Sequence, residues 1–180
     1  MTDSMSPSDS AALFDGVRLT LARHLAGERK SELAAKIGRS PTAVAAWESG
    51  NKRPTPSNVA ELSLGLGVDP AFFAVAHQDA SIMNGVPHFR SLRATSQLAR
   101  DQALAYGRLA VDIAVGIERH VEFPSVDLLR IASDLENLSS EIPEEAARAV
   151  RQSWGMGEGP LGHLVRLVEN HGILVVFSPP

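Results

Sequence analysis

Apolar residues in the first half of the chain recur at helical spacing, and short breaks divide them into five segments. The first segment places an apolar residue at every fourth position, at Leu13, Val17, Leu21 and Leu25. Glycines follow the first four segments and are typical of helix ends, at Gly27, Gly38, Gly50, and Gly65 with Gly67. A brief fifth helix is predicted from Pro70. The pattern predicts a helical domain over residues 11–76, after a disordered tail at residues 1–10 that is rich in Ser, Asp and Pro.

The second and third predicted helices have clear boundaries. Gly38 is expected to adopt the left-handed conformation that ends a helix over residues 30–37. Ser40 followed by Pro41 is typical of a helix start, because serine caps the free amides and proline is tolerated at the first helical position. We expect a small core to set the angle between these two helices, formed by Leu33, Ala34, Ile37, Val44 and Trp47.

The second half of the chain predicts further helices. A turn at Asn84-Gly85 and the proline at Pro87 indicate a linker over residues 77–90. Helices are then expected over residues 91–121, 125–135, 143–154 and 161–170, with one strand at residues 173–177. A single strand cannot form a sheet, so it either pairs with a partner chain or begins an unfinished α+β domain. The predicted fold class is mainly α, with a helical region over residues 91–180.

Composition limits the classes of protein to which the chain can belong, and the distribution of charge indicates one candidate binding surface. The first residues lack the basic start and apolar stretch of a signal peptide, no apolar run is long enough for a membrane, and the sequence has no cysteine. We therefore expect a cytoplasmic protein without disulfides or cysteine-bound zinc. The net charge is −4, but residues 29–54 contain six basic and two acidic side chains, a local charge of +4. A basic cluster in an acidic chain is typical of a small phosphate-contacting surface.

Residues 32–54, ELAAKIGRSPTAVAAWESGNKRP, resemble the XRE family of lambda-repressor-like DNA-binding domains. The resemblance extends over about residues 13–73 and includes the closing LGVDPAFF. It implies a five-helix helix-turn-helix domain in which the helix over residues 40–49 enters the major groove and the helix over residues 30–37 lies across it. It also implies a sequence-specific transcriptional regulator, for which we expect a repressor that binds double-stranded DNA as a homodimer.

Two groups of residues are candidate DNA contacts. The groove-facing candidates lie on the recognition helix and are Ser40, Pro41, Thr42, Ala43, Ala45 and Ala46. The phosphate-contacting candidates are basic or polar residues on either side of it, namely Arg29, Lys30, Arg39, Asn51, Lys52 and Arg53. Thr42 offers a hydroxyl and the alanines offer methyl groups to thymine, so direct base reading is expected to be sparse and DNA shape to contribute to specificity. Trp47 and Glu48 are expected to be structural.

The segments from Phe89 onward, FRSLRATSQLARDQALAYGRLAVDIAVGIERHVEFP and RQSWGMGEGPLGHLVRLVENHGILVV, resemble the linker and opening of proteins that join an XRE domain to an ImmA/IrrE-type metallopeptidase-like domain. In that family a later H-E-x-x-H helix binds zinc, and this chain contains no such motif through Pro180. His163 and His171 are eight residues apart, and Glu169 is not placed between ligands at the required spacing. We therefore expect no metal, no cofactor and no enzymatic activity.

Three alternatives remain open. A helical domain of this kind can retain its fold and lose DNA in favour of a protein partner. The chain can be an antitoxin or adaptor whose residues 91–180 bind another protein while the first domain represses transcription. It can also be the N-terminal part of a metallopeptidase regulator. If the chain is a DNA-binding homodimer, the long helix over residues 91–121 is a candidate dimer contact, because its apolar residues cover more than one face.

Overall fold

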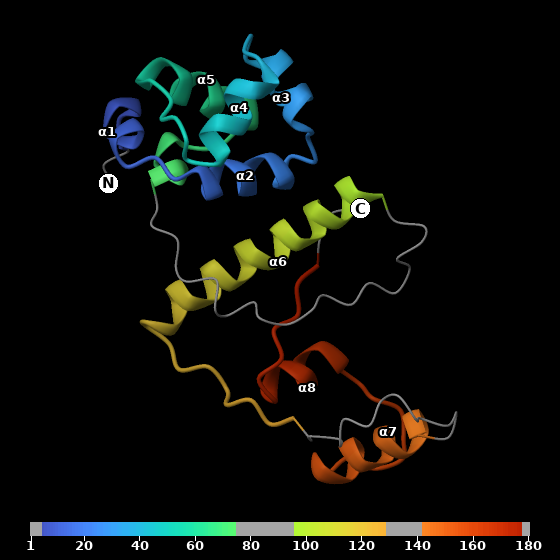
Figure 1. Cartoon of the computed structure of the whole chain (residues 1–180). Helices are drawn as coiled ribbons and strands as arrows, with labels where there is room; N and C mark the ends of the chain where they lie inside the picture. The colour runs from blue at the N-terminus through green and yellow to red at the C-terminus, as the bar shows by residue number, and fades with distance from the viewer. Residues whose placement is uncertain (1–4, 75–95, 129–141, 178–180) are drawn as a thin grey trace. The chain divides into compact units, whose positions relative to one another are not determined.

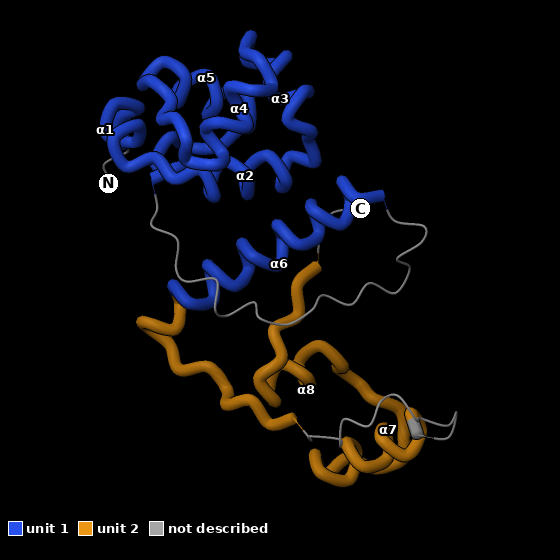
Figure 2. Tube along the Cα trace, viewed as in Figure 1, with its two compact units in different colours: residues 1–116, 180 blue, residues 117–179 orange. Residues whose placement is uncertain are grey.

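The computed structural model describes residues 5–74, 96–128 and 142–177 (Figure 1). These ranges form eight α-helices and one 3-10 helix: α1 Pro7–Ala12, α2 Gly16–Leu25, α3 Lys30–Lys36, α4 Pro41–Glu48, α5 Pro56–Leu66, η1 Pro70–Ala74, α6 Gln97–Glu118, α7 Ile142–Ser153 and α8 Leu164–Asn170. The chain divides into two compact units, which meet within the last turn of α6 (Figure 2). In the described ranges, no helix is long and apolar enough to span a membrane.

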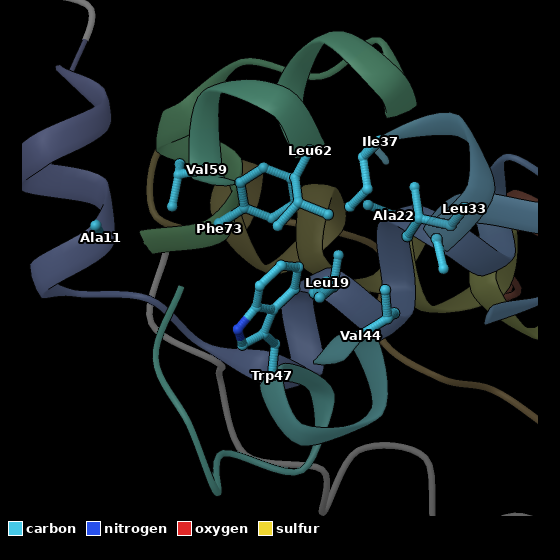
Figure 3. Packing of buried hydrophobic residues seen from close by; sticks show 11 residues of the cluster. Ala11, Leu19, Ala22, Leu33, Ile37, Val44, Trp47, Val59, Leu62 and Phe73 are labelled. Atoms are coloured by element: carbon cyan, nitrogen blue, oxygen red, sulfur yellow. The ribbon is translucent and has the colours of Figure 1, made fainter. Parts of the chain in front are cut away.

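The first unit has its core where α1 to α5 and η1 meet (Figure 3). Eleven apolar side chains are buried together there: Ala11, Leu19, Ala22, Leu33, Ala34, Ile37, Val44, Trp47, Val59, Leu62 and Phe73. The Trp47 ring points from α4 into this cluster (Figure 3), and Phe73 brings η1 against it, with its ring centroid 5.7 Å from that of Phe14. All five residues predicted to set the angle between the second and third helices belong to this core, which confirms that prediction.

The boundaries of α3 and α4 follow the predicted capping residues. Gly38 has a φ of 64°, and the Ser40 hydroxyl accepts a hydrogen bond from the Ala43 amide at 3.2 Å. Pro41 is the first residue of α4. Helix α5 begins at Pro56, because Thr55 caps it by accepting a hydrogen bond from the Asn58 amide at 3.3 Å. It continues through Gly65 and ends at Leu66, before Gly67 in the left-handed conformation. The local signals of this region are therefore sufficient to define its helices.

The beginning of the chain differs from the prediction. The disordered tail at residues 1–10 is wrong from Pro7 onward, since α1 forms there and buries Ser10 and Ala11 against α5 and η1. Ser6 and Pro7 repeat the start signal that Ser40 and Pro41 provide for α4, and the Ser-rich composition concealed it.

The apolar stripe predicted for the first helix is also partly wrong. Leu13 and Val17 are exposed, because Asp15 caps α2 and leaves Leu13 in the turn before it. The buried face of α2 instead carries Leu19 and Ala22. Two arginines of this helix, Arg18 and Arg23, are buried as well.

The second half matches the prediction for some helices only. Helix α6 lies inside the predicted range 91–121, and α7 agrees with 143–154 within one residue at each end. Helix α8 is shorter than predicted because residues 161–163 are not helical. The helix predicted over 125–135 does not begin by residue 128, and its remainder lies outside the described residues, as does the predicted linker at 77–90.

The strand predicted at residues 173–177 is absent from the structure. A strand needs a ladder of backbone hydrogen bonds to a neighbour. The described part of this segment has no such ladder, and the nearest cross-connection joins the Asp127 amide to the His171 carbonyl at 3.2 Å. High β-propensity at Ile173 to Phe177 is therefore not matched by a pairing partner.

Candidate nucleic-acid interface

Helices α3 and α4 and the turn between them form a rigid pair. The turn closes when the Arg39 amide donates to the Ala34 carbonyl at 2.8 Å, with Gly38 in the left-handed conformation. Helix α2 supports α4 from behind at very close range. A Cβ atom at Gly16 would overlap the backbone carbonyls of Trp47 and Glu48. The orientation of α4 is thus set by backbone contact as well as by the apolar core.

A buried ion pair also fixes α4 to α2. The Arg23 guanidinium contacts both Glu48 carboxylate oxygens, at 2.6 and 3.3 Å, and donates to the Glu28 carbonyl at 2.8 Å. The Arg23 and Glu48 side chains are 6% and 5% exposed. Lys30 Nζ lies 3.0 Å from the second Glu48 oxygen, so one carboxylate joins α2, α3 and α4. Glu48 and Trp47 are therefore structural, as predicted.

The outward face of α4 carries few hydrogen-bonding groups. Pro41 and Thr42 are exposed, whereas Ala43, Ala45 and Ala46 are half-buried. Ser40 is exposed, but its hydroxyl is used to cap the helix. The face that α4 offers to a groove is consequently one threonine hydroxyl surrounded by methyl groups.

The side chains predicted to contact phosphates differ in the contacts that they already make within the protein. Arg29, Lys30, Arg39, Asn51, Lys52 and Arg53 are all exposed. Arg39 is directed to α5, where it binds Asn58 Oδ1 at 3.1 Å and Glu61 Oε2 at 2.9 Å. Arg53 donates to the Ala12 carbonyl at 2.8 Å. Both arginines must break these contacts before they can bind a phosphate.

Three of the candidates have no strong side-chain contact of their own to break. In the described part of the chain, the side chains of Asn51 and Lys52 make no hydrogen bond or ion pair. Arg29 has one loose ion pair with Glu32 at 3.9 Å, in which both side chains are mostly in water. Such exposed pairs contribute about 0–1 kcal/mol, so Arg29 can exchange Glu32 for a phosphate at little cost.

A hollow of about 660 Å³ lies beside the start of α3 and the end of α4. Its walls include Thr20 and His24 of α2, Arg29 and Lys30, and Ser49 at the end of α4. Burial, followed by the charge of Arg23, lowers the pKa of His24 below its usual 6.5. Sequence reasoning missed Thr20 and His24, because α2 lies outside residues 32–54 and no spacing rule connects it to α4. It also passed over Ser49, which lies inside that motif at the end of α4.

The two C-terminal histidines, which lie in the second unit, have different surroundings. The His171 ring stacks on Trp154 with centroids 4.0 Å apart, and its Nδ1 lies 3.1 Å from Asp127 Oδ2. His163 precedes the first residue of α8. Among the described residues, no three His, Asp or Glu side chains are grouped as a metal site requires.

Comparison with protein families matches residues 27–73 to a family model described as Helix-turn-helix. Residues 27–73 form a helix-turn-helix domain. This domain contains α3, α4, α5 and η1, and all twelve predicted DNA-contacting residues fall within it. Helix-turn-helix domains place their second helix in the major groove, which here is α4. Comparisons with curated proteins and with solved structures found no match. The resemblance to ImmA/IrrE-type proteins stays a prediction.

Proposed function

We propose that the chain is a sequence-specific transcriptional regulator of the XRE type, which represses by occupying its operator as a homodimer. The observation that supports this most directly is the helix-turn-helix domain, in which α4 has an exposed outer face beside unengaged cationic and polar side chains. The proposal assigns the protein to the cytoplasm and gives it no enzymatic role.

In this proposal α4 lies in the major groove and reads few bases directly. Thr42 bonds a base edge, and the methyl groups of Ala45 and Ala46 contact thymine methyls. Lys52, Asn51 and Arg29 bind phosphates on either side of the groove. Because phosphate contacts then supply most of the affinity, binding should weaken steeply with salt.

Helix α6 is the proposed dimer contact. Ile113 and Ile117 are exposed and lie four residues apart, so they share one face of the helix. Burying such a face against a second copy would remove apolar surface from water. A two-fold dimer would bind two half-sites, and the operator should be palindromic.

The test is selection from a randomised duplex pool, followed by binding measurements at several salt concentrations. The wild type should enrich a palindromic site. Lys52→Ala should weaken binding to all sequences and make the salt slope shallower by about one phosphate contact, a change of about 0.9 in log Kd per log salt. The matched control is Lys36→Ala, which removes the same charge from a lysine already paired with Glu28 at 2.7 Å.

Two results would contradict the proposal. One is the absence of enrichment together with no binding above background at low salt. The other is an equal loss of affinity in Lys52→Ala and Lys36→Ala, which would show that overall charge rather than the α4 edge determines binding.

A further inference from the structure

A buried ion pair joins the helix-turn-helix region to α6. Arg18 of α2 lies 2.6 Å from Asp112 of α6, and the two side chains are 6% and 13% exposed. The Arg18 guanidinium also lies over the Phe72 ring, 5.4 Å from its centroid. Arg108, one turn earlier on α6, reaches the other Asp112 oxygen at 3.4 Å. Both charges are poorly solvated while α6 lies on α2, so replacing Asp112 alone would leave Arg18 buried there without this partner and would disfavour the docked position of α6.

A second contact sets the direction of α6. The Gln102 side-chain amide donates to the Leu25 carbonyl at 3.0 Å, near the end of α2. Gln102, near the start of α6, therefore contacts Leu25 at the end of α2. Asp112, in the second half of α6, contacts Arg18 near the start of α2. The two helices run antiparallel, and the N-terminal turn of α6 extends past the end of α2 toward α3.

That turn forms one wall of the open hollow beside α3 and α4. Ser96, Gln97, Leu98 and Asp101 line one side of it, and Arg29, Lys30 and Ser49 line another. Two carboxylates, those of Asp101 and Glu48, also face this space. A phosphate that approaches Arg29 or Lys30 through this hollow has to pass the first turn of α6 and the Asp101 carboxylate.

We propose that α6 is an autoinhibitory element whose first turn borders the hollow beside Arg29 and Lys30 and restricts the approach of a DNA backbone phosphate from that side. DNA binding then requires α6 to leave α2. This inference rests on the proposed function, and it adds an internal competitor for the DNA-binding surface. The apparent affinity for DNA is then the intrinsic affinity multiplied by the fraction of molecules in which α6 has left α2.

The experiment compares the full chain with Asp112→Asn and with Gln102→Ala, which breaks the second contact without a change of charge. Glu118→Gln is the matched control, since it removes one negative charge from an exposed position of the same helix. Affinity is measured for the duplex enriched in the selection and for a duplex of mixed sequence. If α6 leaves α2 in about one wild-type molecule in ten, Asp112→Asn should bind both duplexes about tenfold more tightly.

A second readout detects α6 without DNA. The chain has no cysteine, so a nitroxide on Ala103→Cys, an exposed position of α6, is the only label. It should broaden the amide signals of Leu25 and Gly27 in the otherwise wild-type chain, and this broadening should decrease in Asp112→Asn and in Gln102→Ala.

The outcomes are distinct. Reduced broadening with tighter DNA binding, and no such change in Glu118→Gln, supports the proposal. Reduced broadening with unchanged or weaker DNA binding overturns autoinhibition and leaves the proposed function in place. Broadening that is absent in the wild type, or unchanged in both variants, overturns the role of these contacts. If α6 is released and no variant binds DNA, the proposed function fails together with this inference.

Discussion

Truncating Glu48 should destabilise the helix-turn-helix domain more than its single charge suggests. Glu48→Ala leaves Arg23 buried, 6% exposed, without its two carboxylate contacts. Removing one partner of a buried ion pair costs about 3–5 kcal/mol. Arg23 keeps its bond to the Glu28 carbonyl, so we expect the lower end, about 3 kcal/mol. For a domain of this size, that loss lowers Tm by about 12–24 °C.

The assay is urea and thermal unfolding followed by tryptophan fluorescence. The chain has two tryptophans, so Trp154→Phe serves as the background in which Trp47 alone reports on the core. Glu61→Ala is the control, because its pair with Arg39 is partly in water and should contribute about 0–1 kcal/mol. A loss in Glu48→Ala no larger than that in Glu61→Ala would refute the reasoning.

Three further predictions concern the same domain. Gly16→Ala should cost about 1–3 kcal/mol in thermal unfolding, because its Cβ overlaps the carbonyls of Trp47 and Glu48. Ser40→Ala should lose about 1 kcal/mol, measured in the same way, since the α4 cap is removed. Because the folded pKa of His24 lies below 6.5, its contribution to stability is present above pH 6.5 and is lost as pH falls below it. His24→Gln should therefore reduce the difference in unfolding free energy between pH 7 and pH 5.

The sequence predicted best the elements that local interactions determine. The turn at Gly38, the cap at Ser40 and the core position of Trp47 depend on neighbours within a few residues, and all three agree with the structure. The strand at residues 173–177 failed for the opposite reason, because a strand requires a partner that the segment itself does not specify.

The sequence predicted which residues belong to the candidate site but not which contacts those residues make. Sequence reasoning treats Lys52, Arg39 and Arg53 alike as exposed cations. The structure separates them, because Glu61 and the Ala12 carbonyl come from other elements and engage the two arginines. The Arg18–Asp112 contact spans 94 positions, and no local periodicity indicates it.

The central claim, that α4 reads the major groove, is tested most directly by changing its one exposed hydroxyl-bearing residue. The duplex selection is repeated with Thr42→Asn, a substitution at an exposed position outside the core. The account predicts that the enriched site changes at one or two adjacent base pairs in each half-site, while the salt slope stays the same. An enriched site identical to that of the wild type would contradict it.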